Sequence, residues 1–201
     1  MDSDSVWRHI DAQRLDLADL IETFSPDQFR TPSLCAGWTV RDVAVHLTQA
    51  HGSPTKVVWA AVRSGFRFDV MIRRHAVDAP TPAAQTPTLL RAMVGSRRHA
   101  IGTTELDALL DVLVHGQDIA VPLGIDREMP PDAAVAAAVR LWPKRFPFHP
   151  ARDHPGVRFV ATDTDLDVGH GRTVQAPVRD ILMLFAGRAA AAGVLTDEVS
   201  D

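Results

Sequence analysis

ELDALLDVLVHGQDIA, residues 105–120, is the strongest helical pattern in the chain. At about 100° per residue, its leucines cover one broad side of a helix, and alanine, valine and isoleucine cover much of the other. Asp111, His115 and Asp118 interrupt this apolar surface, and they form one narrow stripe. A helix that is apolar nearly all round is mostly buried. The stretch therefore predicts a central helix whose polar stripe is either a thin solvent face or a buried functional site.

Other helical patterns surround this one along the first part of the chain. Thr39 is a good N-cap, and Asp42 follows it at capping-box spacing. The proline-rich residues 78–88 are not compatible with a regular helix. Helices with one apolar face each most simply pack as a bundle, so we expect a four-helix bundle over residues 1–124. The helices are expected at residues 5–24, 39–47, 56–75 and 105–120, with a further helical piece at 88–100 that Gly102 ends.

The pattern changes after residue 124. A helix is expected from Pro131 to about Trp142, followed by a loop over residues 143–156. Short alternating runs then predict strands, the first two joined by a turn at residues 163–165. The strands are expected at residues 157–161, 166–168 and 173–176, and a last helix from Pro177 to Gly193. The fold class is therefore mainly α, with a small α+β lobe over residues 125–201.

Composition bounds the possible functions. The chain has 201 residues, 46% hydrophobic, with a formal net charge of −4, which gives no attraction to nucleic acid or anionic lipid. The acidic N-terminal residues are unlike a secretory signal, and no apolar run approaches the roughly 20 residues of a membrane span. A single cysteine, Cys35, excludes an internal disulfide and a Cys-rich zinc site. We expect a cytoplasmic protein without nucleic-acid or membrane partners.

Three side chains have the spacing of a metal site. Asp111 and His115 lie four residues apart, so they share one face of their helix. His46 borders the apolar stripe of the helix at residues 39–47 and is the natural third ligand. Two imidazoles and one carboxylate leave a coordination position open for water or substrate. Spacing alone also allows a histidine satisfied in the core and an ordinary ion pair on a helix surface.

Other residues offer weaker candidates. His51 follows the end of its helix, which favours a loop histidine. Asp118 either orients His115 or is a surface aspartate. Cys35 has no evident histidine partner near it in the sequence, which favours a small buried residue over a nucleophile. Several arginines of the middle segment suit either an anionic substrate or, as we favour, a solvated helix face; they are Arg63, Arg67, Arg73, Arg74, Arg91, Arg97 and Arg98.

Four stretches carry a family resemblance, which runs nearly end to end. They are SLCAGWTVRDVAVHL (33–47), GFRFDVMIRR (65–74), LDVLVHGQDIAVPLG (110–124) and FAGRAAAAG (185–193). Together they resemble the mycothiol-dependent maleylpyruvate isomerase family, a branch of the DinB-like metal-binding bundles. The resemblance implies a divalent metal, usually Zn²⁺, held by His46, Asp111 and His115. The family commonly has glutamate where this chain has Asp111. Arg188 matches the arginine of the C-terminal lobe that is implicated in the isomerase, and so is the candidate catalytic residue.

The resemblance implies a metal-dependent enzyme that uses mycothiol, the small thiol of actinobacteria. The expected activity is isomerisation or S-transfer on a small electrophile, a dicarboxylate being one option, through a metal-bound thiolate. Two alternatives use the same ligands. One is a non-catalytic binding protein that the metal only stabilises; with either function, we expect a monomer or homodimer. The other is a metal-dependent hydrolase with Asp118 as general base.

Overall fold

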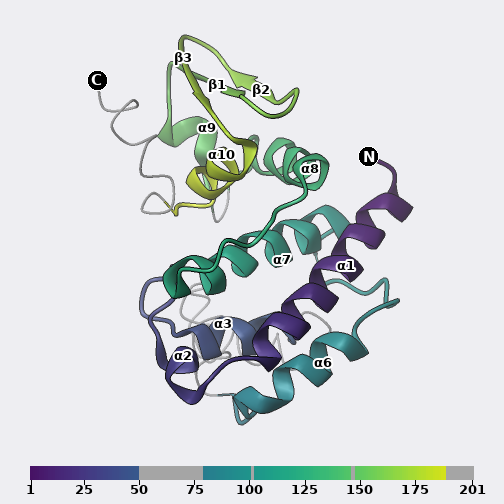
Figure 1. Ribbon diagram of the computed structural model, residues 1–201. Coiled ribbons are helices and arrows are strands. Elements are labelled where there is room, and N and C mark those ends of the chain that lie inside the picture. The colour runs from purple at the N-terminus through teal and green to yellow at the C-terminus, as the bar shows by residue number, and fades with distance from the viewer. Residues whose placement is uncertain (50–78, 101, 146–147, 189–201) are drawn as a thin grey trace. The chain divides into compact units, whose positions relative to one another are not determined.

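The computed structural model describes residues 1–49, 79–100, 102–145 and 148–188, and Figure 1 shows its elements. It confirms a mainly α fold with a small α+β lobe. The chain divides into two compact units, Asp2–Ile125 and Asp126–Asp201, here called the N-terminal and C-terminal units. The helix expected at residues 56–75 and the histidine His51 lie outside the described residues.

Helices make up the described part of the N-terminal unit. They are α1 (Ser3–Glu22), α2 (Pro26–Arg30), α3 (Val40–Leu47), α6 (Thr86–Ala92) and α7 (Glu105–Ala120), with the 3₁₀ turns η1 (Ala83–Gln85) and η2 (Val121–Leu123). The capping box expected at the start of α3 is present: Thr39 N–H donates to Asp42 Oδ2 at 2.9 Å. Thr104 and Asp107 repeat this arrangement at the start of α7, with a distance of 3.0 Å. Local sequence therefore sets where the two site-bearing helices begin.

Four of the described helices surround one apolar core in this unit. α1 packs against α6 and α7, and α3 packs against the same two helices (Figure 1). The core residues come from all four helices: Leu17, Ala18, Ile21, Val40, Val43, Ala44, Leu47, Leu90, Met93, Val112 and Ile119. This arrangement brings one face of α3 against one face of α7.

The helical piece expected at residues 88–100 is displaced. α6 begins earlier, at Thr86, because Pro87 lies in its first turn, where no N–H donor is needed. It ends earlier, at Ala92, and the chain turns at Gly95, whose φ of +78° suits glycine. The prediction that Gly102 ends this helix was therefore wrong.

The C-terminal unit combines helices with a small sheet. Its described elements are α8 (Pro131–Leu141), α9 (Pro150–Asp153), β1 (Val157–Ala161), β2 (Asp167–Gly169), β3 (Arg172–Ala176) and α10 (Val178–Phe185). The strand order is β2-β1-β3. β1 pairs antiparallel with β2, with Phe159 opposite Val168, and parallel with β3, with Phe159 opposite Val174. The rings of Phe159, Trp142 and Phe185 meet at 5.0–6.0 Å between centroids and form the centre of this unit.

Two features of this unit differ from the sequence prediction, and the pairing of one strand is a feature that the prediction did not specify. Residues 143–156, expected as a loop, contain the short helix α9. β3 pairs with β1, and Gly171 permits the crossing because a Cβ there would lie 2.2 Å from the carbonyl oxygen of Gly156. α10 ends at Phe185 and not at Gly193, since Gly187 takes a φ of +76°.

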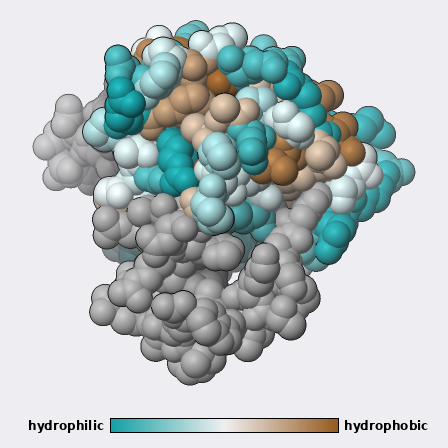
Figure 2. Space-filling view, turned by 90° about the horizontal axis from the view of Figure 1, so that it is seen from below, coloured by the Kyte–Doolittle hydropathy of each residue, from teal (hydrophilic) through white to brown (hydrophobic). Residues whose placement is uncertain are grey.

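The described surface carries mixed polar and apolar residues. Figure 2 shows hydrophobic residues between hydrophilic ones on the described part of one face. Among the described helices, none has both the length and the apolar character that crossing a membrane would require.

Candidate metal centre

His46 comes from the last turn of α3. Its side chain is 18% exposed, and the ring of Trp38 packs edge-on against it at 5.5 Å between centroids. The neighbours of His46 in the helix, Val45 and Leu47, are buried. His46 therefore lies at the edge of the core, with its orientation restricted by Trp38.

Asp111 and His115 lie one turn apart on α7 and face His46. Asp111 Oδ1 is 3.4 Å from Nε2 of His46 and 3.4 Å from Nε2 of His115. The two imidazole rings meet at 4.9 Å between centroids. The structure therefore brings together the three residues that spacing had selected, and we call them the His–Asp–His group.

The spacing of these atoms suits a bound cation. Zinc bonds of about 2.0–2.1 Å in a tetrahedral arrangement put neighbouring ligand atoms about 3.3 Å apart. The two distances of 3.4 Å are close to this value and longer than a good hydrogen bond. One ligand atom from each residue of the group lies within 4.8 Å of the other two. Two nitrogens and an oxygen suit zinc and several other divalent metals, so the residues fit the group that the family implies.

Asp118 holds the other side of the His115 ring. Its Oδ2 lies 2.7 Å from Nδ1 of His115, and its side chain is fully buried. A proton on Nδ1 leaves Nε2 unprotonated, with its lone pair directed at Asp111. A histidine that binds a metal through Nε2 needs this tautomer. The alternative that Asp118 is a surface aspartate was wrong. Because Asp118 binds the nitrogen remote from Asp111, the geometry does not favour it as a general base for a water at the group.

Cys35 is the residue that sequence reasoning missed. Its thiol donates to Asp118 Oδ2 at 3.0 Å, and its sulfur lies 3.7 Å from Nδ1 of His115. The backbone N–H of Leu34 donates to the carbonyl of Asp118 at 3.3 Å, which ties the loop before α3 to α7. A histidine partner exists, but it comes from 80 residues further along the chain. Only the shared family motif around Cys35 gave a sequence signal for it.

The electrostatics of the group favour a positive charge at its centre. Burial alone would raise the pKa of Asp111, but the imidazoles of His46 and His115 outweigh it and hold that pKa far below its ordinary value. Burial alone would lower the pKa of His115, but hydrogen bonds to Asp111, Asp118 and Cys35 raise it well above the usual range. The same carboxylates that retain a proton on His115 attract a metal cation.

The remaining predicted residues lie elsewhere. Arg188 is in the C-terminal unit, where its Nη1 donates to the carbonyl of Ala186 and its guanidinium lies 5.8 Å from the centroid of the Phe148 ring. Of the middle arginines, Arg91 pairs with Asp19 and Glu22 of α1, and Arg97 pairs with Asp4. These pairs fit the solvated-face interpretation. Arg63, Arg67, Arg73 and Arg74 lie outside the described residues.

The fold and the site together define a helical bundle with a His–Asp–His group of metal-ligand type. Residues 10–108 match the family model described as the mycothiol maleylpyruvate isomerase N-terminal domain. This match, over just under half of the chain, supports the resemblance in the sequence. The match includes His46 and ends before Asp111 and His115. No curated protein and no solved structure matches the chain significantly.

Proposed function

We propose that this protein is a metal-dependent thiol enzyme, an isomerase or S-transferase that uses mycothiol and acts on a small electrophile in the cytoplasm. His46, Asp111 and His115 would hold one divalent metal, expected to be Zn²⁺. The convergence of their ligand atoms from two helices, with Asp118 behind His115, is the observation that carries the proposal. The family match supports mycothiol as the thiol.

Accessibility favours an enzyme over a purely structural site. Side chains in the group are partly exposed, 33% for Asp111 and 18% for His46. A structural metal site is normally closed by four protein ligands, whereas a catalytic site keeps one position open. The group offers three ligands and a solvent-accessible side, so an exogenous thiol has access.

The chemistry follows from these ligands. A bound divalent metal would lower the pKa of a coordinated thiol and so provide a thiolate at neutral pH. The proposed reaction is addition of the thiol sulfur to an electrophilic carbon. An S-transferase releases the conjugate, and an isomerase reverses the addition after rotation about the new single bond.

The residues of this chain would prepare the site for that reaction. Asp118 keeps the proton of His115 on Nδ1, and Trp38 limits rotation of the His46 ring. Asp111 stays ionised because its pKa is far below the ordinary value. Arg188 remains the predicted catalytic residue of the C-terminal unit, with the role of binding an anionic group of the substrate.

The test compares His46→Ala with His99→Ala, which changes an exposed histidine of the same unit. Metal content would be measured by elemental mass spectrometry, and cobalt-loaded protein would be titrated with mycothiol. We expect about one metal per chain in the wild type and in His99→Ala, with a cobalt spectrum that shifts toward thiolate ligation. His46→Ala should lose the metal and the shift.

Other outcomes separate the alternatives. A bound metal whose spectrum ignores thiols would replace the enzyme with a metal-stabilised binding protein. Full metal content in His46→Ala would remove the His–Asp–His group as the site.

A further inference from the structure

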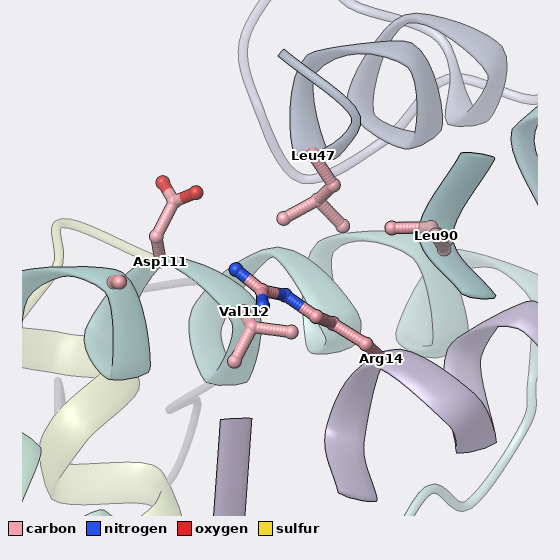
Figure 3. A pocket seen from close by; sticks show the side chains of 6 residues that line it. Arg14, Leu47, Leu90, Asp111 and Val112 are labelled. Carbon is pink, nitrogen blue, oxygen red and sulfur yellow. The ribbon is translucent and has the colours of Figure 1, made fainter. Parts of the chain in front are cut away.

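One buried charge lies near the His–Asp–His group without belonging to it. Arg14 of α1 is only 3% exposed. It lines the same small cavity as Asp111; the other lining residues are Leu47, Leu90, Ala108 and Val112. Figure 3 shows the guanidinium of Arg14 extending from α1 toward the side where Asp111 stands. A positive charge is therefore buried near one of the proposed metal ligands.

The contacts of Arg14 cancel only part of its charge. Its Nη1 donates to two neutral acceptors, the carbonyl of Met93 at 3.1 Å and that of Ser96 at 3.5 Å. The same nitrogen lies 3.6 Å from Oδ1 of Asp11, which is too long for a good hydrogen bond. Burying a charge is costly, so a buried arginine normally has a closely bonded carboxylate. Arg14 has no such close carboxylate among the described residues, which leaves its charge able to act on Asp111.

The cavity is too small for a ligand, so any effect of Arg14 on the metal centre acts through space. It has room for about one water molecule. Burial lowers the pKa of Arg14, and the negative charges of Asp11 and Asp111 act in the opposite direction. Arg14 and Asp111 are therefore within electrostatic reach of each other, with little solvent in the cavity to screen the interaction.

The charge of the loaded centre depends on Arg14. Asp111 and Asp118 are carboxylates that lie against the His115 imidazole, at 3.4 Å and 2.7 Å. Together they cancel the double positive charge of a divalent metal. Without Arg14 the loaded centre would be close to neutral, and with Arg14 it carries a net positive charge. A positive charge repels the metal cation and attracts an anion to the open coordination position.

We propose that Arg14 sets the charge of the metal centre, so that it weakens binding of the divalent metal and strengthens binding of an anion at the open position. The inference rests on the proposed function, because there the anion is the thiolate sulfur. A neutral centre would bind its metal more tightly and stabilise a thiolate less. Arg14 acts through the field of its charge and not by contact with the metal or the thiol.

The competing explanation is that Arg14 only joins α1 to the end of α6. In that case its loss would loosen the bundle and weaken metal and anion binding alike. Arg14→Gln removes the charge and keeps a hydrogen-bond donor, whereas Arg14→Lys keeps the charge and removes the guanidinium. Arg8→Gln makes the same change in net charge at an exposed arginine of the same helix, one that donates to Ser5, and serves as the matched control.

The experiment measures two affinities of each variant at one pH and one ionic strength. Zn²⁺ affinity comes from competition with a chromophoric chelator, and azide affinity from the visible spectrum of cobalt-loaded protein. Arg14→Gln should bind zinc about tenfold more tightly, because charges in a partly buried site interact several times more strongly than in water. Azide carries half the charge of the metal, so its affinity should fall by about threefold. Arg14→Lys and Arg8→Gln should stay within about twofold of the wild type.

The sign of the change decides between the explanations. Weaker zinc binding by folded Arg14→Gln, or azide affinity that does not fall, would overturn the proposal. If Arg14→Gln does not fold, Asp11→Asn decides, because it removes the negative charge 3.6 Å from Arg14. Its zinc affinity should fall and its azide affinity should rise; unchanged affinities would overturn the proposal.

A thiol titration of the cobalt-loaded wild type tests the proposed function separately. If its spectrum ignores mycothiol while zinc and azide affinities change as expected, the enzyme proposal fails and the effect of Arg14 stands. If the spectrum shifts with mycothiol while Arg14→Gln leaves both affinities unchanged, only the role of Arg14 fails.

Discussion

Asp118→Asn offers the sharpest test of how the candidate metal centre is organised. The substitution keeps the size of the side chain and removes its charge. In the structure Oδ2 of Asp118 is 2.7 Å from Nδ1 of His115, the length of a charge-assisted hydrogen bond. The carboxylate is fully buried, so water does not screen the interaction. Asparagine would hold the His115 tautomer less firmly and make Nε2 a weaker ligand.

The expected loss of metal affinity in Asp118→Asn follows from these features. Removing an acceptor behind a metal-bound histidine typically weakens metal affinity by about 10–100-fold. At about 1.4 kcal/mol per factor of ten, this is about 1.4–2.8 kcal/mol of binding free energy. The short distance and complete burial favour the upper half of that range.

The assay is competition for Zn²⁺ between the protein and a chromophoric chelator, with circular dichroism to verify folding. Asp19→Asn, which neutralises an exposed aspartate of the same unit, should leave the affinity unchanged. Affinity of folded Asp118→Asn within about twofold of the wild type would refute the role of Asp118 in orienting His115.

Substitutions at three further residues test particular contacts. Cys35→Ser keeps a donor to Asp118 and should retain zinc affinity, whereas Cys35→Ala should weaken zinc affinity in the same chelator assay. Equal zinc affinities of the two variants would contradict this role of the Cys35 donor. Thr39→Ala removes the cap of α3 and should lower the free energy of unfolding in urea by about 1 kcal/mol, with Thr39→Ser near wild type. Burial lowers the pKa of His154 in the folded protein. As the pH falls below about 6.5, His154 is therefore protonated in the unfolded chain before it is protonated in the folded protein. The free energy of unfolding should therefore fall with the pH in that range, and His154→Gln should reduce the slope; an unchanged slope would exclude His154 as its source.

Much of the fold was predictable because its signals are local. Thr39 and Asp42 mark the start of α3 through backbone hydrogen bonds within one turn. The alternation at residues 157–161 matches β1 in both bounds. Helix ends were less predictable: α6 stops before Gly95 and α10 before Gly187, where glycine takes a positive φ. The parallel pairing of β3 with β1 has no local signal, since it depends on which strand edge the chain reaches.

The site divides in the same way. Asp111, His115 and Asp118 share a stripe of one helix, and helical periodicity alone brings them to one face. Cys35 shows the limit of this reasoning, because its partners on α7 are 80 and 83 residues away. A contact of that separation depends on how helices pack, which the spacing of residues in one segment does not specify.

The sequence by itself determined roughly where most of the described helices and strands begin, and which face of α7 carries polar groups, because capping, periodicity and turn residues act within a few positions. The family motifs added the identity of the expected ligands. Only the tertiary structure decided that His46 meets Asp111 at 3.4 Å and that Asp118 is buried behind His115. It also buried Arg14 of α1, whose Nη1 donates to the carbonyl of Met93 at 3.1 Å. These contacts join separate helices, and burial of the shared apolar core is what fixes the position of each helix against the next.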